Sequence, residues 1–200
     1  MTPPSEPALG AGLPALPDPF ADLRATLDAA LPAASRPGLV LREVPAPRRL
    51  APHAVALGAE VFRGQVEVAH GRLVILHDPE GQDGWHGQTR VVAFVSADVE
   101  SEMAQDAALA EVGWQWLTES LGGRGAAYLA AGGTVTRTAS CRFGELQQPD
   151  ERSELEIRAS WTAVADAQDR LDLGVHLLAW CDLLAATSGL PPPGVTGLNR

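Results

Sequence analysis

The sequence contains no lysine, and all fifteen of its positively charged side chains are arginines. Without lysine the chain can neither form a Schiff base with a carbonyl substrate nor anchor pyridoxal phosphate. A P-loop also requires a lysine on the β- and γ-phosphates, so nucleotide hydrolases of that class are excluded. The absence is typical of a GC-rich genome, which favours arginine, alanine, glycine and proline codons, but the exclusions hold whatever its cause.

Cysteine and net positive charge are also scarce. Cys141 and Cys181 are the only two cysteines, which is too few for a secreted domain held together by disulfides. Both fall on apolar faces of expected elements, where a thiol is usually inert. The formal net charge of −10 disfavours direct binding to the phosphate backbone of a nucleic acid.

Long apolar runs are missing as well, since no segment approaches the roughly 20 apolar residues that span a bilayer. Residues 1–17 are rich in proline, alanine and glycine, and this composition predicts a disordered N-terminal segment. They lack a positively charged start and a continuous apolar run, so they do not resemble a signal peptide. We therefore expect a soluble cytoplasmic protein with a single domain over residues 18–190 and a disordered tail over residues 191–200.

Three segments show the apolar spacing of helices. The first begins at Asp18-Pro19, a good helix start, and Pro32 is expected to end it. Residues 111–121 form the second helix. The third begins at Asp172 as its N-cap and runs to about residue 187, with one apolar stripe along it.

Other segments alternate apolar and polar residues as β-strands do. The alternation is clearest over residues 154–161, and over 134–143 it is broken only by Arg137. Another pair of strands is expected to flank a turn at His70-Gly71. The expected strands cover residues 61–69, 72–77, 89–95, 134–143 and 154–161, and residues 39–42 are a candidate for a further short strand. These strands have one polar face, which solvent can cover, and one apolar face. They predict an α+β single domain, in which helices cover one face of an antiparallel sheet of about five strands.

Residues 77–87, HDPEGQDGWHG, gather histidines and acids in one turn-forming stretch. As a metal site the stretch would use His77, Asp78, Asp83 and His86, whose nitrogen and oxygen atoms suit zinc, manganese or iron. As a metal-free acid–base site it would use Asp78, Asp83 or His86. The spacing matches no stereotyped metal motif, and the three glycines and Pro79 also predict a plain hairpin loop. Both interpretations stay open.

Three tryptophans are candidate binding residues: Trp85 within that stretch, and Trp114 and Trp116 in the second helix. Trp85 could simply pin the loop to the body of the domain. Two positions apart on a helix, the other two indoles point about 200° apart, so one core cannot easily bury both. We expect one of them either to pack beneath the preceding loop or to face a pocket, a second subunit or a partner, where tryptophan is enriched.

Several segments in the same order resemble a known family. They are HDPEGQDGWHG, EVGWQWLTESL at 111–121, GTVTRTAS at 133–140, ELEIRASW at 154–161 and the terminal LAWCDLLAATSGLPP. The family is catalogued as domain of unknown function 3000, and the resemblance spans roughly residues 50–193. It implies an actinobacterial cytoplasmic protein, and it implies no particular activity. It also implies a link to a ribonuclease D-like exonuclease and a haem-pathway decarboxylase, which tend to be encoded beside its members.

The residues favour a non-enzymatic domain that binds a protein partner, a second copy of itself or a small ligand through Trp85, Trp114 and Trp116. The alternative is a metal-assisted or carboxylate-based hydrolase with its site in residues 77–86. The sequence predicts no cofactor, no membrane partner and no direct binding of nucleic acid.

Overall fold

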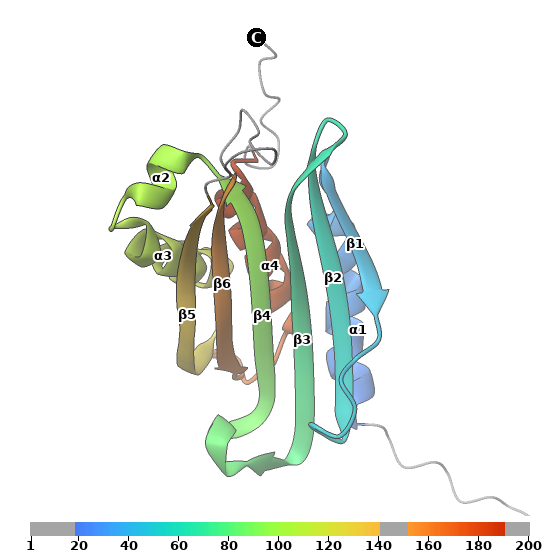
Figure 1. Cartoon of the computed structure of the whole chain (residues 1–200). Coiled ribbons are helices and arrows are strands. Elements are labelled where there is room, and N and C mark those ends of the chain that lie inside the picture. The colour runs from blue at the N-terminus through green and yellow to red at the C-terminus, as the bar shows by residue number, and fades with distance from the viewer. Residues whose placement is uncertain (1–18, 141–151, 191–200) are drawn as a thin grey trace, which may run out of the picture.

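The computed structural model describes residues 19–140 and 152–190. An open, six-stranded antiparallel sheet and four α-helices form one α+β domain (Figure 1). The sheet has six strands where the sequence predicted about five, because the segment at residues 39–42 belongs to a full strand, Leu39–Val44, that pairs along its whole length. The predicted disordered segments, 1–17 and 191–200, lie outside the described residues.

The strands pair in the order β1-β2-β3-β4-β6-β5. Strands β1 to β4 form a meander of neighbouring antiparallel strands, and β6 then lies between β4 and β5. The strands are β1 (Leu39–Val44), β2 (His53–Arg63), β3 (Val66–Gln82), β4 (Gly87–Val99), β5 (Tyr128–Ser140) and β6 (Arg152–Ala163). The helices are α1 (Pro19–Ala34), the 3-10 helix η1 (Asp83–Trp85), α2 (Ser101–Gln105), α3 (Leu109–Gly123) and α4 (Leu173–Ser188).

Helices α1, α3 and α4 lie on one face of the sheet (Figure 1), as the sequence predicted. Helix α4 packs between α1 and α3 and covers the central strands β3 and β4. Its ends follow the predicted signals, since the Asp172 side chain accepts a hydrogen bond from the Gly174 backbone N–H at 2.8 Å and Gly189 ends the helix with a left-handed φ of 65°. Because helices flank it on both sides, α4 is buried well beyond the single predicted stripe.

The predicted turn at His70-Gly71 is wrong, because both residues lie inside the continuous strand β3. The turn lies instead at Gly64, whose φ is 67°, between β2 and β3. A Cβ atom on Gly71 would lie 2.7 Å from the Phe94 carbonyl oxygen and 2.9 Å from the Trp180 ring. Glycine is needed here because α4 packs closely on the sheet.

Two other expectations also differ from the structure. Helix α1 continues through Pro32 to Ala34, because a proline in the last turn removes few of the helix's hydrogen bonds. In β5 the predicted apolar face is poorly covered, with Val135 half-buried and Ala139 exposed, because β5 is an edge strand. Arg137 interrupts the alternation because it donates hydrogen bonds to backbone carbonyls just beyond and within α2.

Candidate functional site

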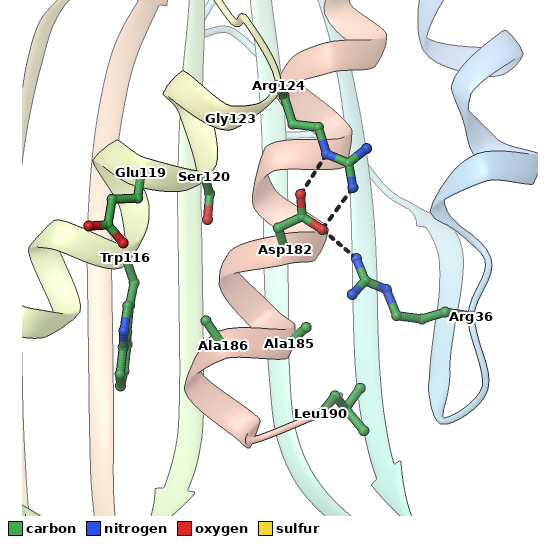
Figure 2. A pocket seen from close by; sticks show the side chains of 10 residues that line it. All are labelled: Arg36, Trp116, Glu119, Ser120, Gly123, Arg124, Asp182, Ala185, Ala186 and Leu190. Atoms are coloured by element: carbon green, nitrogen blue, oxygen red, sulfur yellow. Dashed lines mark hydrogen bonds and ion pairs between the residues drawn. The ribbon is translucent and has the colours of Figure 1, made fainter. Parts of the chain in front are cut away.

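A groove of about 490 Å³ lies between α3 and α4 on the helical side of the domain (Figure 2). Its lining comes from α3, from α4 and from the connection between α1 and β1. One end is ionic and contains Arg36, Arg124 and Asp182, whereas Trp116, Ala186 and Leu190 provide apolar surface. The groove therefore combines charged and aromatic contacts within one surface.

At the ionic end, Asp182 on α4 binds two arginines that come from different elements (Figure 2). Arg36 Nη2 donates to Asp182 Oδ1 at 2.7 Å. Arg124, at the end of α3, donates from Nε to Oδ2 at 2.5 Å and from Nη2 to Oδ1 at 2.9 Å. Two positive charges and one negative charge meet here, so this cluster carries a net charge of +1 in a chain whose formal charge is −10.

The cluster stays ionised at neutral pH. Burial of the Asp182 carboxyl favours its neutral form, but the hydrogen bonds from Arg124 and Arg36 outweigh burial and hold its pKa below the usual value. The hydrogen bond to Asp182 in turn raises the pKa of Arg124. Asp182 therefore stays charged at ordinary pH and offsets one of the two guanidinium charges.

Arg36 has spare hydrogen-bonding capacity. Only 9% of its side-chain surface is exposed, yet Asp182 is the one acceptor that its guanidinium contacts within the described residues. A guanidinium carries five N–H donors. No fully buried side-chain nitrogen in the described part of the chain lacks a partner. The remaining Arg36 donors therefore reach open space, and Arg36 lines the groove.

The two tryptophans of α3 lie on opposite sides of its buried stripe, which is formed by Gly113, Leu117 and Leu121. Trp116 lines the groove. Trp114 packs on the other side, where its ring lies 3.0 Å from the position that a Cβ atom on Gly133 would occupy. Both indoles are half-buried and contact the core, so a regular helix accommodates both without burying either completely.

Trp85 lies elsewhere, in the hairpin between β3 and β4. It ends the helix η1 and is half-buried, and its backbone carbonyl accepts a hydrogen bond from the Thr162 hydroxyl on β6. The next residue, His86, takes a left-handed φ of 57° and leads into β4. The hydrogen bond through Thr162 pins the hairpin to the sheet, and Trp85 does not line the groove.

The four candidate ligands of that hairpin have separate surroundings. His77 is buried, with Nδ1 2.9 Å from the Thr89 hydroxyl, and its ring stacks on Phe20. The Asp78 carboxylate accepts hydrogen bonds from the Glu80 backbone N–H and the Gln82 side chain, while Asp83 and His86 are exposed. In residues 19–140 and 152–190, no three histidine, cysteine, aspartate or glutamate side chains form a group that could hold a metal ion.

Sequence reasoning did not find the arginine–aspartate cluster. Arg36 and Asp182 are 146 positions apart, and Arg124 lies in a Gly-Gly-Arg-Gly run that reads as the end of a helix. No local pattern connects these three residues. Only Trp116 among the groove residues carried a signal, because its spacing from Trp114 placed the two indoles on different sides of a helix.

The fold and the groove define a two-layer α+β domain with a groove in its helical layer. The sequence model of a family described as "Protein of unknown function (DUF3000)" matches residues 16–196. The chain belongs to this family, which confirms the resemblance found in the sequence. No curated protein and no solved structure matches the chain significantly. Within the described residues, none of the helices has the length and apolar character needed to cross a membrane. The actinobacterial origin stays a prediction.

Proposed function

We propose that the protein is a non-enzymatic binding domain whose groove between α3 and α4 takes an acidic segment of a protein partner. A carboxylate of the partner binds Arg36 and Arg124, and a neighbouring apolar side chain packs against Trp116. The observation that carries the proposal is the Arg36 guanidinium, whose side chain is only 9% exposed, which has a single acceptor among the described residues and further N–H donors open to the groove.

The two guanidinium groups at the ionic end favour a carboxylate there, while Glu119 lines the groove beside Trp116, away from that end. The planar guanidinium group matches a carboxylate in a bidentate arrangement, and such charge-assisted hydrogen bonds are among the stronger ones in proteins. Asp182 supplies one carboxylate for two arginines. A second carboxylate from the partner would balance the remaining charge at a partly buried position, where the attraction is screened less than in open water.

The shape of the groove favours a segment of polypeptide over a compact small molecule. Its lining follows α4 from Asp182 to Ala186 and continues to Leu190, two residues beyond the end of the helix at Ser188. An elongated surface with arginines and a tryptophan fits a short run of side chains from a partner, because these residue types dominate interface hot spots. Binding roles for Trp85 and Trp114 stay predictions.

A purely structural role is the main alternative explanation of the cluster, since Asp182 also holds three elements together. A useful test must therefore leave Arg36, Arg124 and Asp182 in place. Ala186 allows this, because it is exposed on α4 and lines the groove. A larger residue at position 186 occupies the groove without removing any native hydrogen bond.

We would select random peptides displayed on phage against the full chain and measure binding of the enriched sequences as synthetic peptides by calorimetry. We expect them to carry aspartate or glutamate beside an apolar residue. Ala186→Glu should weaken their binding more than about tenfold, which corresponds to roughly 1.4 kcal/mol. Ala186→Arg, which fills the groove similarly but has the opposite charge, should weaken it less. Ala29→Glu, at an exposed position of α1, should leave it unchanged.

Three outcomes would contradict the proposal. Enrichment of peptides without acidic residues would remove the role of the arginines. Equal losses in both Ala186 variants would show that only space matters. Full binding to Ala186→Glu would place the peptide elsewhere. The hydrolase alternative stays a prediction, to which the positions of the residues in the 77–87 hairpin add no support.

A further inference from the structure

Strand β5 is the outermost strand on one side of the sheet (Figure 1). Within the described residues it pairs only with β6, so its outer edge has no strand partner among them. It is 13 residues long, whereas β1 at the opposite edge has only 6. A long edge offers a row of backbone N–H and C=O groups to any strand that can pair with it.

Over Thr134–Ser140 this edge has few of the features with which proteins usually prevent such pairing. From Thr134 to Ser140 there is no proline, and the only charged residue is Arg137, whose guanidinium is turned toward the backbone of α2 and the residue after it. The irregularity in pairing is confined to the start of the strand, between Leu129 and Gly132. The remaining stretch is regular and rich in threonine, which has high β propensity.

We propose that this edge binds a second copy of the chain. The two β5 strands pair antiparallel about a two-fold axis through Thr136 and join both sheets into one. The proposal goes beyond the peptide groove and uses a different surface. Symmetric pairs of this kind are the commonest form of soluble oligomer.

The sequence of β5 is self-complementary in this register. Residues opposite each other lie on the same face, so Thr136 meets Thr136 of the second copy and Thr134 meets its Thr138. Opposed threonines are a favourable cross-strand pair. An axis through Arg137 would instead place two guanidinium groups opposite each other, which is destabilising. The Thr136 register sets Arg137 opposite Val135.

Charge and apolar surface also favour this edge as the contact. The chain carries a formal charge of −10, so like charge opposes association, and a contact at β5, which contains no acidic residue, adds no close repulsion between carboxylates. Stable interfaces bury at least about 1,200 Å² in total. Two paired strands alone bury less than this, so side chains beside β5 must supply the rest of the buried area. Helices α2 and α3 pack beside β5 and provide Met103, which is 40% exposed, and the half-buried Trp114.

The test is sedimentation velocity of the full chain over a dilution series. Wild type should show a species of about 42 kDa, twice the chain mass of 21.0 kDa, that dissociates on dilution. Thr136→Lys and Thr136→Glu each place like charges on the axis, and each should raise the dimer dissociation constant at least about tenfold. An equimolar mixture of the two variants should restore the dimer, because opposite charges then face each other.

Thr136 lies opposite Glu156 of its own chain, so Thr136→Lys gains an intrachain partner and folds even if Thr136→Glu does not. The matched control is Val40→Glu, since Val40 is 48% exposed on β1 at the other edge, and this variant should dimerise like wild type. A wild type that is monomeric at every concentration overturns the proposal. So does a dimer that survives Thr136→Lys, or one that Val40→Glu weakens as much. Ala186→Glu should leave the dimer intact, which separates this proposal from the peptide groove.

Discussion

His176 is a buried histidine whose neighbour fixes its tautomer. The Trp161 indole N–H donates a hydrogen bond to His176 Nδ1 at 3.1 Å, so Nδ1 is unprotonated and the ring proton of the neutral form lies on Nε2. Burial lowers the pKa of His176 from 6.5 to about 4, although the nearby Asp172 carboxylate acts in the opposite direction. The side chain is therefore neutral at physiological pH.

This shift predicts how stability depends on pH. Because the folded pKa lies below the unfolded value, the unfolded state takes up the proton first as the pH falls. The contribution of His176 is fully present above pH 6.5 and decreases by about 1.4 kcal/mol per pH unit as the pH falls toward 4. Urea unfolding at a series of pH values measures it. Below about pH 4.5, Glu60 and Glu156 also contribute, since their arginine partners lower their pKa values.

The control for this prediction is His176→Gln, which keeps a polar side chain but cannot titrate. In the variant, the dependence of the unfolding free energy on pH should flatten between pH 6.5 and about 4.5. An unchanged slope in that window would assign the effect to other groups.

Gly71 is a second residue whose role the structure defines. Gly71→Ala should lower the free energy of unfolding by about 1 to 3 kcal/mol, because its methyl group would overlap the Phe94 carbonyl and the Trp180 ring. Gly84→Ala is the matched control, since no heavy atom lies within 4 Å of its added Cβ. Chemical denaturation of both variants checks the prediction, and equal losses would contradict it.

At the residue scale the sequence predicted burial better than it predicted contacts. Cys181 lies in the core as expected, and burial raises the pKa of its thiol to about 12, so it is inert at neutral pH. Cys141 lies outside the described residues. Arg137 could only be recognised as an exception to the alternation, because its acceptors on and beyond α2 are about thirty positions away.

At the scale of elements, Asp182 joins three parts of the helical layer. Asp182→Asn keeps the volume but removes the charge that both arginines need, so the free energy of unfolding should fall by about 1 to 3 kcal/mol. Glu43→Gln is the control, because the Glu43 side chain is 55% exposed where it pairs with Arg24, and an exposed pair contributes at most about 1 kcal/mol. Thermal or urea unfolding of the two variants makes the comparison, and a larger effect of Glu43→Gln would contradict it.

Helix ends were predictable where local chemistry determines them. Asp172 and Gly189 mark α4 because an N-cap acceptor and a left-handed C-cap act within a few residues. The limits of β2 and β3 were not predictable in the same way. The glycine at position 71 looks identical to a turn glycine in the sequence, and only the packing of Trp180 from a distant helix shows the difference.

At the scale of the whole molecule, the two-layer α+β architecture followed from apolar spacing, but the arrangement of strands did not. The position of β6 between β4 and β5 depends on pairing between segments far apart in the chain, which no local pattern encodes. The candidate groove depends on the same long-range arrangement, because Arg36, Arg124 and Asp182 meet only after the helical layer has formed.

The place of α4 in the chain has a consequence for protein synthesis. It follows all six strands in the sequence, and it covers the middle of the sheet, where Trp180 lies against Gly71. A nascent chain can pair its meander strands early, yet their apolar face stays uncovered until α4 leaves the ribosome. Products of premature termination before Leu173 would keep that face exposed, which makes them substrates for chaperones and proteases.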